Sequence, residues 1–82
     1  MYKLIFDEEA IKYLEKLPKS ISKRIFLKLQ ICKTNPHRYF ERLVGRTEYK
    51  LRVGDYRVIA DINDSKIVIV VVRIGHRKRI YK

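Results

Sequence analysis

Two arginines face each other across a predicted β-hairpin, an arrangement suited to binding an anion. If Gly54 and Asp55 form the turn, Arg52 pairs with Arg57. Lys50 then lies on the same face, because side chains alternate along a strand. Like charges placed opposite each other normally destabilise a sheet. The hairpin is therefore either a site where three cations bind a phosphate or a face on which they all extend into water.

A second basic segment follows the last apolar run, and its order is Gly75-His76-Arg77-Lys78-Arg79-Ile80-Tyr81-Lys82. Gly75 lets the chain bend as it leaves a sheet. Arg77, Arg79 and Tyr81 share one face if the segment stays extended. Arginine suits bidentate contacts to phosphate, and a tyrosine ring can stack on an unpaired base. The segment is either part of a nucleic-acid site or a frayed basic terminus.

Few side chains in this sequence are placed to move a proton. His76 is one candidate, since imidazole titrates near neutrality. Glu48 is another, because alternation puts it on the face of Lys50. Asp61 shares that alternation further along the hairpin. A lone histidine is more often a surface or capping residue, which is the interpretation we favour for His37.

The sequence predicts neither a metal site nor a cofactor. Its acidic residues and histidines form no cluster with metal-ligand spacing, and Cys32 alone cannot form a structural zinc site. A nuclease built from these residues would use the 2′-hydroxyl of RNA as its nucleophile. The protein would remove the hydroxyl proton, neutralise the phosphorane oxygens with Lys and Arg, and protonate the departing 5′ oxygen.

The elements that must position these residues begin with a strand and two helices. Residues 2–6 alternate as a short strand. Asp7 is a good N-cap for a first helix, which Pro18 ends. A second helix carries an apolar stripe that includes Cys32, so we expect this thiol in the core. The Asn35-Pro36 pair ends the second helix.

The pattern then changes to a period of two residues, which is typical of strands. Residues 39–43 predict a short strand, and residues 47–53 and 56–62 predict the hairpin. Residues 66–74 are almost continuously β-branched, which suits a central strand covered on both faces. The order predicts a single α+β domain over residues 1–82. Its N-terminal strand and two-helix hairpin precede a mostly antiparallel sheet of three or four strands.

Composition points to a polyanionic partner. The chain has 82 residues with 20 Lys and Arg against 9 Asp and Glu, a formal net charge of +11. Residues 65–82 contain no acidic residue, so the charge is concentrated at that end. Nucleic acid is the first candidate partner, an anionic membrane surface the second and an acidic protein the third. A surface tuned only for solubility does not require such concentration.

The sequence also predicts a cytoplasmic protein that does not enter a membrane. The longest apolar run covers residues 67–72, whereas a membrane-spanning helix needs roughly 20 residues. The opening residues reach an acidic group too soon for a secretory signal. Cys32 is the only cysteine, so no internal disulfide can form.

The whole chain resembles the RelE/ParE toxin superfamily, on the RelE side. The resemblance is carried in order by Tyr2-Lys3-Leu4-Ile5-Phe6, Asp7-Glu8-Glu9-Ala10, Lys16-Leu17-Pro18, Leu43-Val44-Gly45, Tyr49-Lys50-Leu51-Arg52-Val53-Gly54-Asp55-Tyr56-Arg57-Val58 and Gly75-His76-Arg77-Lys78-Arg79-Ile80-Tyr81. It implies a small α+β fold and a metal-independent endoribonuclease that cuts mRNA on the ribosome. It also implies an acidic RelB-like antitoxin as a partner.

The resemblance implies roles for individual residues. Lys50 is similar to a family lysine assigned to the base or to charge stabilisation. Arg57 resembles the arginine that holds the scissile phosphate. Arg77 resembles the one that stabilises charge or protonates the leaving group. Tyr81 resembles the tyrosine that stacks on the substrate base. The chain departs from the family at Glu48, where the best-known RelE enzymes carry a second lysine.

The remaining basic residues, Arg52, Lys78 and Arg79, are expected to bind RNA beside these groups. His76 and Glu48 stay alternative candidates for acid and base. Two other functions remain open at this point. One is a ParE-like poison of DNA gyrase that cleaves no RNA. The other is a non-enzymatic module that binds RNA or the ribosome.

Overall fold

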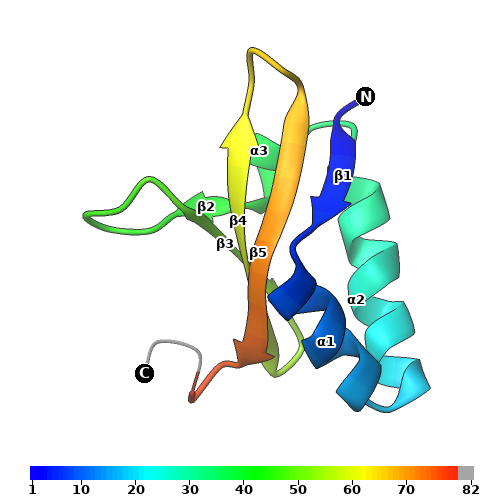
Figure 1. The fold of residues 1–82 in the computed structure, drawn as a ribbon. Coiled ribbons are helices and arrows are strands. Elements are labelled where there is room, and N and C mark those ends of the chain that lie inside the picture. Colours follow the sequence, from blue (N-terminus) through cyan, green and yellow to red (C-terminus); the bar gives the residue numbers. More distant parts are fainter. Residues whose placement is uncertain (80–82) are drawn as a thin grey trace.

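The computed structural model describes residues 1–79, and its elements follow the predicted order (Figure 1). The helices and strands are β1 (Lys3–Phe6), α1 (Glu8–Lys16), α2 (Lys19–Cys32), α3 (Pro36–Tyr39), β2 (Glu41–Arg42), β3 (Tyr49–Val53), β4 (Tyr56–Asn63) and β5 (Val68–His76). None of the helices in this part of the chain is long and apolar enough to cross a membrane.

The strands of residues 1–79 form one five-stranded sheet in the order β1-β5-β4-β3-β2. β1 runs parallel to β5, and the other neighbouring strands are antiparallel. The helices α1 and α2 lie together on one side of this sheet (Figure 1). This arrangement confirms the predicted α+β class, and the antiparallel part contains four strands, within the predicted three or four.

The start of the chain follows its local signals. Asp7 caps α1, and its carboxylate oxygen accepts a hydrogen bond of 3.0 Å from the Glu8 N–H. The α1 helix ends at Lys16, two residues before Pro18, and α2 begins at Lys19. This boundary is expected because proline restricts the residue before it and suits the start of a helix.

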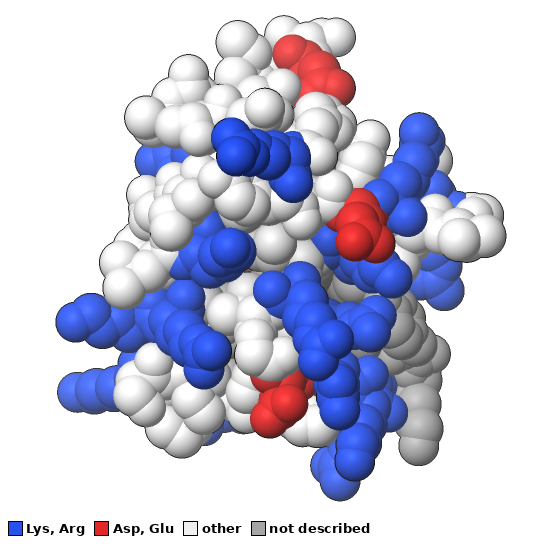
Figure 2. Space-filling model, turned by 180° about the vertical axis from the view of Figure 1, so that it is seen from behind, with Lys and Arg blue, Asp and Glu red and all other residues white. Residues whose placement is uncertain are grey.

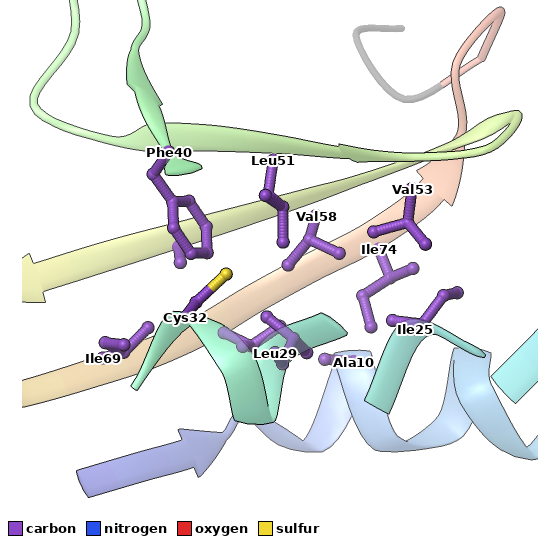
Figure 3. Packing of buried hydrophobic residues seen from close by; sticks show 12 residues of the cluster. Ala10, Ile25, Leu29, Cys32, Phe40, Leu51, Val53, Val58, Ile69 and Ile74 are labelled. Atoms are coloured by element: carbon purple, nitrogen blue, oxygen red, sulfur yellow. The ribbon is translucent and has the colours of Figure 1, made fainter. Parts of the chain in front are cut away.

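The core lies between the helices and the inner face of the sheet (Figure 3). Its fully buried members include Ile25, Leu29 and Cys32 from α2 and Val58 from β4. Removing such side chains from water is the main source of folding free energy. The predicted burial of Cys32 is confirmed, and that burial raises the pKa of its thiol.

The structure differs from the prediction after α2. Residues 36–39 form the short helix α3 rather than a loop and the start of a strand, so β2 contains only Glu41 and Arg42. Pro36 occupies the first turn of α3, where its fixed φ suits a helix. The Phe40 N–H donates a 2.8 Å hydrogen bond to the Pro36 carbonyl, which closes this turn.

The last strand is displaced towards the C-terminus relative to residues 66–74. Ile67 has a φ of 55°, so the chain is still turning there, and β5 begins at Val68. The strand continues to His76. A register shift lies between Ile59 and Ala60: Ala60 pairs with Val71, but Ile59 pairs with Arg73. Val72 is therefore an extra residue, which forms a β-bulge.

Candidate active site

The predicted hairpin is confirmed residue by residue. Arg52 pairs with Arg57, Lys50 pairs with Ile59, and Gly54 has the positive φ (58°) that the turn requires. Side-chain alternation puts Lys50, Arg52 and Arg57 on the outer face, which we define as the face of the sheet turned away from α1 and α2. The side chains on the other face of the hairpin, those of Leu51, Val53 and Val58, are buried in the core.

The basic segment after β5 approaches the same end of the sheet. Arg57 pairs with Gly75, and the Arg77 N–H donates a 2.9 Å hydrogen bond to the Asp55 carbonyl. Arg77 thus continues the ladder beside the hairpin turn, one strand away from Arg57. Segments separated by about twenty residues are brought together because β4 and β5 pair along their whole length.

Lys50, Arg52 and Arg57 line a cavity of ≈ 390 Å³ beside β3. The same cavity is also lined by Lys28 of α2, Arg38 and Tyr39 of α3, and Glu41 of β2. The Lys28 ammonium lies 5.0 Å from the centre of the Tyr39 ring. Figure 2 shows Lys and Arg side chains gathered over the lower half of the molecule, with isolated acidic groups among them. Such a cavity suits an anion and an aromatic partner.

The two facing arginines differ in their surroundings. Arg52 is exposed, and its Nε–H donates a 3.3 Å hydrogen bond to the Gly54 carbonyl, which directs the side chain along the turn. Arg57 is half-buried in the same row. The cations therefore do not all extend into water, and Arg57 and the half-buried Lys50 keep part of their side chains against the sheet.

Glu41 is a carboxylate next to Lys50 that the strand alternation did not indicate. Glu48 lies just before β3, and its carboxylate is 3.7 Å from the Arg46 guanidinium. Glu41 pairs directly with Lys50 across β2 and β3 and lines the same cavity. The sequence did not reveal this neighbour because a two-residue strand such as β2 is too short to give a recognisable alternation.

His76 lies at the end of β5 and pairs with Tyr56, so it has the opposite parity to Arg57 and Gly75. Its ring meets the Tyr56 ring edge-on at 5.6 Å. The Lys78 N–H donates a 3.4 Å hydrogen bond to His76 Nδ1, which leaves a proton for Nε2 in the neutral ring. His76 does not line the cavity that holds Lys50.

Within the described residues, the basic segment does not stay extended after β5, so the condition under which Arg77 and Arg79 share one face is not met. The strand ends at His76, and the chain turns through residues 77–79, where the Arg79 N–H donates a 2.8 Å hydrogen bond to the His76 carbonyl. Arg77, Lys78 and Arg79 are exposed. Tyr81, the predicted stacking residue, lies outside the described residues.

Arg73 is a cation near the site that sequence reasoning missed. It pairs with Ile59, which pairs with Lys50 on its other side, so the three belong to one row on the outer face. Arg73 also lines a groove of ≈ 840 Å³ between α1 and the end of β5. A single arginine within the run of β-branched residues was the available signal.

A separate polar cluster lies at the opposite end of β4. Asp64 Oδ1 accepts a 2.7 Å hydrogen bond from the Tyr2 hydroxyl and lies 2.8 Å from His37 Nε2. The bonds from His37 and Tyr2 lower the pKa of the Asp64 carboxyl, and the bond to Asp64 raises the pKa of Tyr2. This cluster ties β1, α3 and the β4–β5 turn together, so His37 is not part of the basic site.

Within residues 1–79, no group of three His, Cys, Asp or Glu side chains is arranged to hold a metal ion. The described cavities instead offer guanidinium and ammonium groups.

Comparison with known proteins gives consistent results. Residues 4–81 match the family described as the ParE toxin of type II toxin–antitoxin systems, parDE. A RelE-like toxin protein of Escherichia coli is 35% identical over 81 residues, covering 95% of this chain and 85% of the relative. The mRNA interferase toxin RelE of Escherichia coli K12 is 32% identical with the same coverage. Among solved structures, the archaeal RelE–RelB complex from Pyrococcus horikoshii has a TM-score of 0.81, with 28% identity, 95% coverage of this chain and 97% of that one.

Proposed function

The chain belongs to the RelE/ParE toxin superfamily of type II toxin–antitoxin systems, and we propose that it is a metal-independent endoribonuclease that cleaves mRNA on the ribosome. RelE of Escherichia coli K12, which aligns with this chain over 85% of its own length, is named an mRNA interferase. Cleavage of mRNA would inhibit translation. We also propose that residues 1–82 act as one domain, in the cytoplasm.

The observation that carries the proposal is the meeting of two basic segments at one end of the sheet. Arg57 and Arg77 lie on neighbouring strand segments. Lys50 lies on the same face as Arg57, in the adjacent row of cross-strand neighbours. A phosphodiester in this place would meet guanidinium groups from both segments. Preorganised cations of this kind stabilise the charge that develops on a phosphorane.

The proposed reaction uses the RNA as its own nucleophile. The 2′-oxygen attacks the adjacent phosphorus, the bond to the 5′ oxygen breaks, and a 2′,3′-cyclic phosphate and a 5′-hydroxyl remain. Arg57 and Arg77 would bind the phosphate oxygens, and Lys50 would stabilise charge or accept the 2′ proton. Tyr81 would stack on the base, with Arg52, Lys78 and Arg79 as further RNA contacts.

Proton transfer requires a group that accepts the 2′ proton and one that protonates the 5′ oxygen. His76 stays a candidate acid because it directly precedes Arg77, although its side chain has the opposite parity to Arg57. Glu41 supports a base role because it pairs with Lys50 and lines its cavity. Glu48 is held by Arg46 instead, which argues for its absence from proton transfer.

A cognate antitoxin is the proposed protein partner. Solved structures similar to this chain include RelE–RelB complexes from Pyrococcus horikoshii and Escherichia coli. A net charge of +11 favours an acidic RelB-like segment.

The matching family model is described as a ParE toxin, so gyrase poisoning is the second candidate function. One pair of assays distinguishes these two candidate functions. Ribosomes programmed with a short mRNA are incubated with the protein, and the RNA ends are mapped. Supercoiling by purified DNA gyrase is measured with the same preparation. We expect cleavage within the mRNA and unchanged gyrase. Intact mRNA with inhibited gyrase would refute the proposal, and salt-sensitive RNA binding without any cleavage would indicate a non-enzymatic module.

A further inference from the structure

The β-bulge in β5 decides where Arg73 points. Ile69 and Val71 are buried in the core, so simple alternation would put Arg73 there as well. The extra residue Val72 reverses the parity. Arg73 therefore pairs with Ile59 on the outer face, and Ile74, 3% exposed, enters the core in its place. Bulges next to functional sites often redirect a side chain in this way.

The burial of Ile59 shows how Arg73 lies on the sheet. Ile59 is 1% exposed, although it belongs to the outer face and not to the core cluster packed against the helices. Its cross-strand neighbours in the same row are Lys50 and Arg73. Long basic side chains cover apolar surface with their aliphatic stems and keep the charge at the rim. We infer that the Arg73 stem covers Ile59 and holds its guanidinium at a fixed position.

One donor of Arg73 lacks an acceptor in the described part of the chain. Its Nε is buried and makes no hydrogen bond there. A buried N–H donor without an acceptor costs free energy, and a bound anion would relieve that cost. Arg73 is one of the residues that line the groove between α1 and the end of β5.

One face of α1 forms the far wall of that groove. Glu9, Lys12, Tyr13 and Lys16 follow helical spacing and all line it. With Arg73, Lys78 and Arg79, the lining contains five cations and one carboxylate, that of Glu9. Lys12 makes an exposed ion pair with Glu8, at 3.2 Å, which is a weak contact in water.

We propose that this α1–β5 groove is a second RNA subsite, which binds the single strand on one side of the cleaved phosphate. Arg73 would bind the phosphate nearest the basic hairpin, and Lys12 and Lys16 the next ones, while Tyr13 offers a ring for base stacking. A cationic groove combined with an aromatic platform is typical of single-strand binding. Gly75, between Arg57 and the groove, presents no side chain to obstruct the strand. The identity of the strand rests on the proposed function.

Binding to a fluorescein-labelled 2′-O-methyl oligouridylate of about twelve nucleotides tests the subsite, because such an RNA lacks the attacking hydroxyl. Anisotropy is measured against salt for the wild type, Arg73→Met and the Lys12→Ala/Lys16→Ala pair. Arg73→Met keeps a stem over Ile59 but removes the charge. The matched control, Lys19→Ala/Lys23→Ala, removes two exposed lysines of α2 that line no described cavity.

We expect the slope of log K against log salt to fall by about 0.7 for each lost phosphate contact, with roughly tenfold weaker binding for each groove variant. The control should keep its slope within about 0.3 of the wild type. Groove variants that match the control would overturn the subsite, as would a wild type that does not bind. Binding of an acidic peptide to the groove, with RNA affinity unchanged by these substitutions, would also overturn the subsite. If groove variants weaken binding but the wild type does not cleave programmed mRNA, the proposed function fails and the subsite stands.

Discussion

Removing the Arg57 and Arg77 guanidinium groups singly and together tests whether they hold the same phosphate. Arg77 lies opposite Asp55, which is two residues from Arg57 along the chain. A rise of about 3.4 Å per residue and a strand spacing of about 4.8 Å put the two Cα atoms about 8 Å apart. Both side chains can therefore reach one phosphate group from that separation.

The expected losses of cleavage rate follow from the electrostatic role of the two guanidinium groups. Removing one preorganised donor typically costs about 10²–10³ in rate, or ~2.7–4 kcal/mol of transition-state stabilisation. We expect about a hundredfold loss for Arg57→Ala and for Arg77→Ala. Independent groups would give a loss of about ten-thousandfold in the double variant, whereas groups that share one phosphate act as a unit and should give roughly a thousandfold.

The assay is single-turnover cleavage of a short mRNA on programmed ribosomes, with saturating protein so that binding differences do not enter the rate. Lys3→Ala is the control, since Lys3 is an exposed cation of β1 at the far edge of the same sheet. Circular dichroism verifies folding of each variant. A double variant whose loss equals the product of the single losses would refute the shared phosphate. Full activity of either single variant would remove that arginine from the reaction.

Three further predictions concern stability and reactivity. Because the folded pKa of Asp64 is lowered below 3.8, its bonds stabilise the protein above that pH and the contribution disappears as the pH falls through the folded pKa; urea unfolding between neutral and acidic pH should therefore show a shallower pH dependence for Asp64→Asn. An identical dependence in both proteins would contradict this. The raised pKa and burial of Cys32 predict slow reaction with a disulfide reagent at mildly alkaline pH and fast reaction in urea; equal rates would show an open thiol. Leu29→Ala should reduce the free energy of unfolding by about 2–5 kcal/mol, whereas Leu27→Ala, at an exposed position, should cost far less. Equal losses in the two variants would contradict the assignment of Leu29 to the core.

The hairpin and the helix boundaries were predictable because their determinants are close in sequence. Gly54 and Asp55 set the turn, and the turn fixes which residues of β3 and β4 face each other. Asp7 and Pro18 act on the backbone within one helical turn. The shared face of Lys50 and Arg57 followed from these local rules alone.

The cavity around that face was only partly predictable. Glu41 and Tyr39 line the same cavity as Lys50 because α3 forms and a two-residue strand then pairs with β3. Neither event leaves a periodic pattern of useful length. The ion pair of Glu48 with Arg46 was not predictable either, because it forms in the loop before β3.

The sequence by itself determined the charge, the order of elements and the basic face of the hairpin, since composition and turn chemistry act locally. Only the tertiary structure decided how β5 aligns with β4, and with it the meeting of Arg57 with Arg77 and the outward aim of Arg73. The physical reason is the two-residue period of a strand. One extra residue, Val72, exchanges the inner and outer faces beyond it, and long-range packing rather than the local sequence selects where that residue is inserted.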